Sequence, residues 1–275
     1  MIGQDESEGS PAQQAADVSA RPFGGIQLFV GGVRVAPVES SRVRSLVAFL
    51  ILHRDAPHSR QRLAFMLWPD SAEAQPRTNL RHLIHTLRQA MPELDRFLDI
   101  TSTSVAWRED TMTWFDVSAF EVAQRGSDSP GISVPEEVVF LRQAIDLYRG
   151  DLLDGLYDDW VLDLREQFRD RYLMQLRRLA AALDAAGDHP EAVRLGRELL
   201  RCDPLREETY RFLMTALATS GDRSGAARVY HECVATLRRE LRVEPSPAPN
   251  FFRRPFGPGW ALVGDAGYSK DPITA

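Results

Sequence analysis

The sequence predicts a mainly α-helical protein in which a winged helix-turn-helix domain of the α+β class precedes an all-α domain of tetratricopeptide-like helices. Three observations support this prediction. Strand-like segments occur only before Asp116, three helical segments lie among them in the order of a winged helix, and a residue pattern recurs at an offset of 34 positions in the second half. The predicted parts are a disordered leader, a winged-helix domain, a helical domain and an atypical tail, at residues 1–22, 23–115, 116–248 and 249–275.

The first predicted elements are two short strands. Residues 1–22 are rich in serine, glutamine, alanine and acidic residues, a composition that predicts disorder. Residues 26–30 and 33–35 are rich in β-branched and large apolar residues, and Gly31-Gly32 between them is a turn signal. We therefore expect a disordered leader and then a pair of strands joined by a glycine turn.

Three helices are predicted next, because the apolar residues after Ser41 fall at helical spacing. Serine is a good N-cap, while proline ends a helix or occupies its first position. On these signals the first helix runs from Ser41 to a point before Pro57, the second follows a Ser59 cap and ends at Pro69, and the third runs from about Pro76 to Ala90.

Strand-like stretches follow at residues 97–100, 104–107 and 112–115, with turns at Ser102-Thr103 and Glu109-Asp110. Strands, three helices and then a hairpin is the element order of a winged helix with an N-terminal sheet. The second and third helices, joined by a short turn, form the predicted helix-turn-helix.

Beyond Asp116 the sequence predicts helices alone, at about 135–149, 158–186, 189–202, 205–220 and 223–241. Two of the breaks between them share a pattern. The residues Ala182-Leu183, Gly187-Asp188, Ala192, Arg194 and Glu198 recur as Ala216-Leu217, Gly221-Asp222, Ala226, Arg228 and Glu232. An offset of 34 residues is the period of a tetratricopeptide helix pair. Such pairs stack into a common core with a concave face, which suits a protein partner.

The charge is distributed unevenly along the chain. The net charge of −6 argues against a nucleic-acid partner only if it is taken as a whole. Residues 23–115 carry 11 basic and 9 acidic residues, whereas residues 116–249 carry 18 basic and 24 acidic residues. Because nucleic-acid affinity needs a basic face and not a basic total, this distribution favours DNA as a partner of the N-terminal domain.

Several classes of protein are disfavoured by composition. Lys270 is the only lysine, so the sequence has no phosphate-binding loop of the G-x-x-x-x-G-K-[ST] kind. Cys202 and Cys233 lie far apart, which argues against a zinc site or a disulfide framework. The polar, acidic start and the absence of an apolar run of about 18 residues predict a cytoplasmic protein with no membrane partner. We expect no catalysis, cofactor or metal.

The third predicted helix carries the candidate site. At about 100° per residue, Leu80, Leu83, Ile84 and Leu87 form one apolar stripe. The positions opposite and beside this stripe are polar or basic, and no acidic residue occurs from Gln75 to Ala90. Such a face fits the DNA major groove, because arginine, threonine and histidine can bond to base edges while flanking arginines neutralise phosphates. The candidate DNA-binding residues are Arg60, Arg62, Arg77, Thr78, Arg81, His82, His85, Arg88 and Arg108.

Different roles are predicted within this set. Arg81 and His85 are expected to read bases, and Arg77 and Arg88 to contact phosphates. Arg60 and Arg62, near the start of the second helix, are placed to hold the DNA backbone. The hairpin from Thr101 to Arg108 is expected to extend towards the neighbouring minor groove.

Other interpretations of these residues stay open. An acid-free basic face can be ordinary solvated surface, and His82 with His85 can in principle hold a metal, although no third ligand lies nearby in the sequence. A carboxylate cluster at residues 158–166 could suggest an enzyme, but alternating arginines favour a solvated helix face. The main alternative function is a tetratricopeptide-type interaction adaptor with a vestigial winged helix.

The chain resembles the SARP-type activators of bacteria, which join an OmpR-like winged helix to a bacterial transcriptional activator domain. The resemblance rests on residues 67–70, 77–81 with 87–88, 148–153, 203–208 and 240–246. It implies binding to direct repeats at promoters, as dimers or side-by-side monomers, and contact with RNA polymerase. The chain departs from the family pattern at Arg242, where glycine is usual, and at residues 248–255, where two prolines break any helix.

Overall fold

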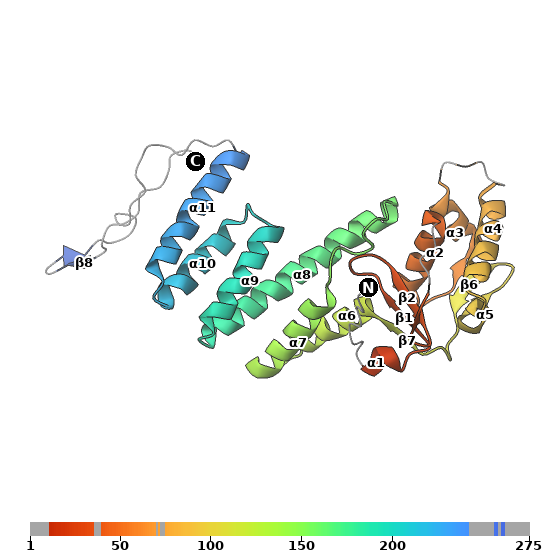
Figure 1. Ribbon diagram of the computed structural model, residues 1–275, viewed down its shortest axis with the longest axis horizontal. Coiled ribbons are helices and arrows are strands. Elements are labelled where there is room, and N and C mark those ends of the chain that lie inside the picture. Colours follow the sequence, from red (N-terminus) through yellow and green to blue (C-terminus); the bar gives the residue numbers. More distant parts are fainter. Residues whose placement is uncertain are drawn as a thin grey trace, which may run out of the picture. The chain divides into compact units, whose positions relative to one another are not determined.

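A computed structural model of the chain describes residues 11–35, 40–69, 71, 75–241, 256–257 and 260–261 (Figure 1). It divides into two compact units, residues 1–187 and 188–275, which we describe separately. The described residues are mainly helical with a small N-terminal sheet region, as the sequence predicts. The unit boundary lies inside the predicted helical domain, so the winged helix and the first helices after it form one unit.

The first unit begins with a four-stranded sheet in the order β3-β2-β1-β7. Its strands are β1 (Val18–Arg21), β2 (Gln27–Val30), β3 (Val33–Arg34) and β7 (Thr113–Phe115). β2 and β3 are the two strands expected around Gly31 and Gly32, whose φ angles of 53° and 78° suit glycine. β1 is antiparallel to β2 and parallel to β7. The stretch predicted as a strand at 112–115 therefore closes the N-terminal sheet.

The prediction of a disordered leader is wrong for its second half. Residues Pro11–Gln14 form the short helix α1, and all four residues of β1 are buried. Burial does not alternate along the strand, because Ser19 and Arg21 are buried together with Val18 and Ala20. Arg21 donates to Gln13 Oε1 at 2.8 Å, and its guanidinium lies 5.4 Å from the centre of the Phe29 ring. Residues 1–10 of the predicted leader lie outside the described residues.

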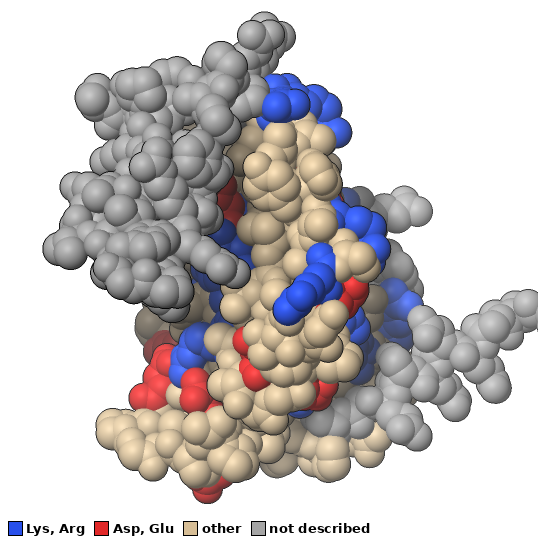
Figure 2. All heavy atoms as spheres, turned by 90° about the vertical axis from the view of Figure 1, so that its left-hand side faces the viewer, with Lys and Arg blue, Asp and Glu red and all other residues tan. Residues whose placement is uncertain are grey.

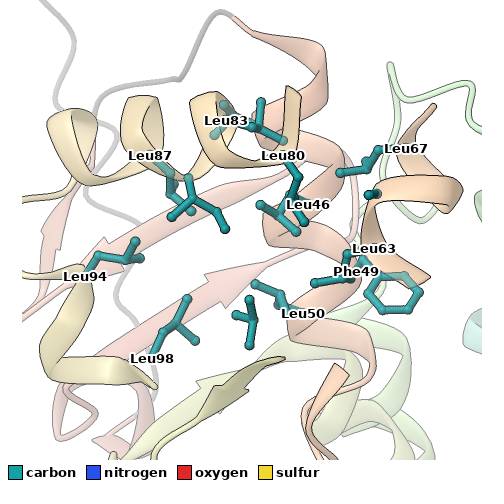
Figure 3. Close-up of a cluster of buried hydrophobic side chains, with 14 of the residues drawn as sticks. Leu46, Phe49, Leu50, Leu63, Leu67, Leu80, Leu83, Leu87, Leu94 and Leu98 are labelled. Atoms are coloured by element: carbon teal, nitrogen blue, oxygen red, sulfur yellow. The ribbon is translucent and has the colours of Figure 1, made fainter. Parts of the chain in front are cut away.

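Three helices follow, close to their predicted positions: α2 (Ser41–Leu52), α3 (Arg60–Leu67) and α4 (Gln75–Ala90). Ser59 caps α3, where its side chain accepts a hydrogen bond from the backbone N–H of Arg62. Figure 3 shows how the helices share one core with the following hairpin. Its buried residues include Leu46, Leu50, Leu63, Leu67, Leu80, Leu83, Leu87, Leu94 and Leu98.

The hairpin consists of β5 (Leu98–Ile100) and β6 (Ser104–Trp107), with the turn at residues 101–103. The two-residue strand β4 (His58–Ser59) pairs with the other edge of β6. The short helix α5 (Leu94–Phe97), which the sequence did not predict, leads into β5. Trp107 Nε1 donates to the backbone oxygen of Leu50 at 2.7 Å, which fixes the hairpin against α2.

Helices α6 (Asp116–Ser127), α7 (Val134–Leu147) and α8 (Asp159–Ala185) complete the first unit. The sequence predicted α7 and α8 within two residues of their ends but missed α6. Two side-chain contacts fasten α8 to α2. Arg42 Nη1 lies 2.9 Å from Asp158 Oδ1, and Trp160 Nε1 donates to Ser45 Oγ at 3.3 Å. The winged helix is thus fixed to the helices after it.

The loop between α7 and α8 adds a further connection to the N-terminal sheet region. Leu152 forms an isolated β-bridge with Phe23, and Gly24 N donates to the backbone oxygen of Asp151 at 3.0 Å. Arg165 holds this loop from α8 through hydrogen bonds to the backbone oxygens of Leu152, Leu153 and Leu156. The run at residues 148–153, which carries part of the family resemblance, therefore has a structural role.

The second unit contains α9 (His189–Cys202), α10 (Glu207–Thr219) and α11 (Arg223–Leu241). Its apolar core includes Leu200, Tyr210, Leu213 and Val229. Gly196 brings α9 close to α10, because an added Cβ would lie 2.6 Å from a methyl carbon of Leu213. Figure 2, viewed from the side that carries α11 in Figure 1, shows basic and acidic side chains on the same face.

The predicted tail at 249–275 lies mostly outside the described residues, as does the departure at Arg242. The described part contains the strands β8 (Phe256–Gly257) and β9 (Trp260–Ala261), which form an antiparallel pair. No helix in the described ranges is long and apolar enough to cross a membrane.

Candidate nucleic-acid interface

Helix α4 has one buried face and one solvent-exposed face. The apolar stripe predicted from the sequence is confirmed, since Leu80, Leu83, Ile84 and Leu87 are all buried. All seven residues of α4 predicted to face outward or to flank that face are exposed, namely Arg77, Thr78, Arg81, His82, His85, Arg88 and Gln89. Apart from Ala90 at its end, the exposed residues of the helix are therefore all polar or basic.

A groove of about 540 Å³ lies beside this face. It is formed by the start of α3, the first half of α4 and the hairpin turn, through Ser59, Arg60, Gln61, Arg77, Leu80, Arg81, Ser102 and Thr103. Three of the predicted DNA-binding arginines meet here, and no acidic residue is among the lining residues. A groove of this composition can bind a phosphate, because guanidinium, hydroxyl and amide groups donate hydrogen bonds to phosphate oxygens.

The hairpin turn is held at the edge of this groove by Arg60. The backbone N–H of Arg60 donates to the oxygen of Thr103 at 2.8 Å, and its Nη1 donates to the oxygen of Thr101 at 3.1 Å. Burial lowers the pKa of Arg60, and the nearby charges of Arg81 and Arg88 lower it further. These positive charges are therefore close enough to repel one another, which an anion in the groove would relieve.

The predicted arginines differ in whether they already have a partner. Arg88 is paired with Asp95, with its Nη2 2.8 Å and its Nε 3.1 Å from Asp95 Oδ1. By contrast, no ion pair involves Arg62, Arg77 or Arg81 in the described ranges. These three guanidinium groups are exposed and available to an incoming anion.

Arg108 does not join the groove. It follows β6 at the end away from the turn, and its Nε donates to the backbone oxygen of Asp95 at 3.0 Å. The tip of the hairpin carries Ser102 and Thr103 instead, and both line the groove. Sequence reasoning did not single out these two residues or Gln61. The only signal for Ser102 and Thr103 was the polar turn between two strand-like segments, and Gln61 was noted only as part of the second predicted helix.

The histidines of α4 show no sign of a metal site. His85 Nε2 lies 3.2 Å from Gln89 Nε2, and the backbone oxygen of His82 accepts a bond from Thr86. Across the part of the chain that the structure describes, no group of three histidine, cysteine or acidic residues is placed to hold a metal ion.

The chain is similar to bacterial proteins that regulate transcription. Residues 115–250 match the family model of the bacterial transcriptional activator domain. Over 247 residues the chain is 26% identical to the transcriptional regulatory protein MoaR1 of Mycobacterium tuberculosis and to that of Mycobacterium bovis, covering 86% of this chain and 78% of each relative.

A solved structure has the same fold. It is that of Mycobacterium tuberculosis EmbR in complex with a low affinity phosphopeptide, with a TM-score of 0.67 and 21% sequence identity. The match covers 84% of this chain but only 62% of the EmbR chain. The sequence comparisons therefore show that the helical region matches the bacterial transcriptional activator domain and that most of the chain is similar to mycobacterial transcriptional regulatory proteins, in agreement with the resemblance to SARP-type activators.

Proposed function

We propose that this chain is a sequence-specific DNA-binding activator of transcription that places α4 in the major groove of promoter DNA. The observation that carries the proposal is the acid-free exposed face of α4, which adjoins a groove lined by Arg60, Arg77 and Arg81. A recognition helix of this kind contacts base edges, while the arginines around it bind phosphates and fix its position.

The structure allows roles to be proposed for individual residues. Arg81 and His85, with Thr78 and His82, are the base-reading candidates, since arginine can bond bidentately to guanine. Arg60, Arg62 and Arg77 are the phosphate-binding candidates. Arg88 and Arg108 have a different proposed role, because both are bonded to Asp95 and so help to position the end of α4 and the hairpin.

The helical region is proposed to contact proteins. Residues 116–249 carry six more acidic than basic residues, a balance that disfavours binding to a phosphate backbone. We propose that this region contacts RNA polymerase and pairs protomers on adjacent promoter repeats, and that the protein acts in the cytoplasm without catalysis. The concave face of stacked helix pairs suits such a partner.

The test begins with the full-length chain and a genomic footprint, which identifies a protected site. Binding to that site is then compared for the wild type, for Arg77→Ala with Arg81→Ala, and for Arg96→Ala as control. Arg96 is exposed and pairs with Glu93 outside the groove. We expect the double variant to lose at least about tenfold in affinity and the control to lose little.

A second step tests activation in a purified transcription assay with RNA polymerase. The full chain is expected to raise transcription from the footprinted promoter. Absence of any protected site, even at low salt, would contradict the DNA-binding proposal and favour a protein-interaction adaptor. Protection without activation would contradict only the polymerase contact.

A further inference from the structure

The first unit contains a cavity of about 260 Å³ behind the proposed DNA-binding helix. It lies between the N-terminal sheet, α2 and the C-terminal end of α4. Val43 and Val47 of α2 and Leu87 and Met91, at and just after the end of α4, form much of its apolar wall. Its size suits a molecule of roughly ten non-hydrogen atoms, which is smaller than a typical drug molecule.

Two arginines line this cavity, Arg34 from β3 and Arg44 from α2. Neither guanidinium has an ion-pair or hydrogen-bond partner among the described residues. The Nε of Arg44 is buried from solvent, and no hydrogen-bond acceptor in the described ranges reaches it. A buried donor without a partner costs free energy, particularly when it carries a charge, so an acceptor from outside would be favoured here.

The charge of the lining selects the kind of acceptor. Asp154 is the one carboxylate among the lining residues, against two guanidinium groups. No ion pair joins Asp154 to either arginine in the described part of the chain. The lining is therefore positive overall, and an anionic group fits it better than a neutral or cationic one.

The inner end of the cavity is apolar. A second void of about 20 Å³ shares Leu28, Val47 and Met91 with it and is otherwise lined by apolar residues. Water gains little in such a void, because it needs two to four polar partners. A ligand with an anionic head would accept hydrogen bonds from the arginines at one end of the cavity. Its apolar body would pack against the apolar residues at the other end.

We propose that this cavity binds a small anionic amphiphile, a carboxylate on an apolar body of roughly ten non-hydrogen atoms. The carboxylate accepts hydrogen bonds from Arg44 and Arg34, and the apolar body packs on Val47 and Met91. Because Leu87 and Met91 also hold the end of α4, occupancy would fix that end and alter DNA affinity. This last consequence rests on the proposed function, whereas ligand binding does not.

Octanoate and octan-1-ol are suitable probes, because they share an apolar chain and differ in the charged head. Isothermal titration of the full chain is expected to show saturable octanoate binding with a dissociation constant below ~10 mM, and much weaker binding of octan-1-ol. The Arg44→Met variant should bind octanoate about tenfold to a hundredfold more weakly, the range expected for a hydrogen bond to a charged group.

Two further variants separate this site from nonspecific binding. Val35→Phe, which adds volume at the cavity lining, should also weaken octanoate binding, whereas Arg201→Met in the second unit should leave it unchanged. The proposal is overturned if octanoate does not bind below ~10 mM, if octanol binds equally well, or if Arg44→Met binds like the wild type while circular dichroism shows both folded.

A separate measurement tests the link to DNA. Octanoate at saturation should change the affinity for the footprinted site severalfold in the wild type and not in Arg44→Met. If octanoate binds but DNA affinity does not respond, the coupling is overturned and the ligand site stands. If no DNA site exists at all, the proposed function fails while the titration result is unaffected.

Discussion

The arginines of the winged helix and those of the helical region have different surroundings. Several arginines of the helical region form ion pairs with one or two carboxylates. Arg178, for example, pairs with Asp128 and Glu137. Arg194 likewise lies between Glu191 and Glu198. On the exposed face around α3 and α4, by contrast, Arg62, Arg77 and Arg81 have no such neighbour within the described ranges. Arginines therefore stabilise the helical region through ion pairs, whereas the arginines around α3 and α4 are available to bind an anion.

This difference shows why net charge alone is a poor guide to the partner. The winged-helix segment 23–115 exceeds neutrality by only two charges. Its acidic residues, however, are not on the exposed face of α4. The carboxylate of Asp95 accepts from Arg88, and the backbone oxygen of Asp95 accepts from Arg108. At α4 a phosphate backbone would therefore meet guanidinium groups that form no ion pair within the described ranges, whereas in the helical region it would have to displace carboxylates.

The largest expected effect concerns Asp116, a buried carboxyl between the two kinds of region. Burial raises the pKa of Asp116 to about 8, although backbone hydrogen bonds from Phe23 and Val117 and the charges of Arg149 and Arg21 act in the opposite direction. The folded chain thus holds a proton that the unfolded chain releases near pH 4, so stability should fall as pH rises from about 4 to about 8.

Asp116→Asn removes this titration. Relative to the wild type, the variant should gain roughly 2–4 kcal/mol in unfolding free energy between pH 4 and pH 8. Urea unfolding followed by tryptophan fluorescence at several pH values measures the gain, with the exposed Asp110→Asn as control. Parallel pH profiles for the wild type and Asp116→Asn would contradict the assignment.

Base readout should give the next largest effect. Arg81→Ala is expected to cost roughly 1–3 kcal/mol on the footprinted site and little on random DNA, and His85→Ala less. Binding titrations on both DNAs at one salt concentration measure this difference. An equal loss on both DNAs would mean that Arg81 binds phosphate and that the reading residues lie elsewhere.

The paired arginines should affect stability and not DNA affinity. Arg178→Ala removes contacts to Asp128, Glu137 and the backbone oxygen of Ser127, and should lower the unfolding free energy by about 1–2 kcal/mol. The affinity of the folded protein for its site should not change. Arg77→Ala should show the opposite behaviour. A loss of affinity in folded Arg178→Ala would remove the distinction between the two regions.

The smallest effect distinguishes two arginines on the same helix. Arg77→Ala should lower the slope of log affinity against log salt by about one unit, because one phosphate contact is lost. Arg88→Ala should lower it by less, since Arg88 is bound to Asp95. Asp95→Asn should release Arg88 and raise the slope. Equal decreases for Arg77→Ala and Arg88→Ala would show that DNA displaces Asp95.

Local signals allowed much of the winged helix to be predicted from the sequence. The Ser59 cap, the apolar stripe of α4 and the repeat breaks depend on residues close together in the chain. β1 was not found in this way. It has only four residues, and although it pairs with the nearby β2, its other partner is β7, much later in the chain, in the register Val18↔Thr113. Helix α6 was missed partly because it ends in Gly126-Ser127, a pair that is typical of turns. Packing explains the glycine, since a Cβ on Gly126 would lie 2.6 Å from the Phe140 ring.

The candidate interface was predictable as a helix face but not as a groove. The exposed residues of α4 follow from helical periodicity, whereas the approach of the 101–103 turn to Arg60 depends on the tertiary fold. The pairing of Arg88 with Asp95 crosses the helix break at Pro92, so helical spacing gave no indication of it. Arg108 was included among the candidate residues as part of the hairpin from Thr101 to Arg108, although it follows β6 at the end away from the turn.

The attachment of α8 to α2 determines how far from the winged helix the other end of this long helix lies. Its 27 residues correspond to roughly 40 Å at 1.5 Å per residue, slightly more than one turn of B-DNA. Asp158 and Trp160 fix its start to the helix-turn-helix domain. Its far end, at Ala185, is therefore held about one DNA turn in length from this attachment, so on the proposed function α8 is long enough to reach from one major groove towards the next.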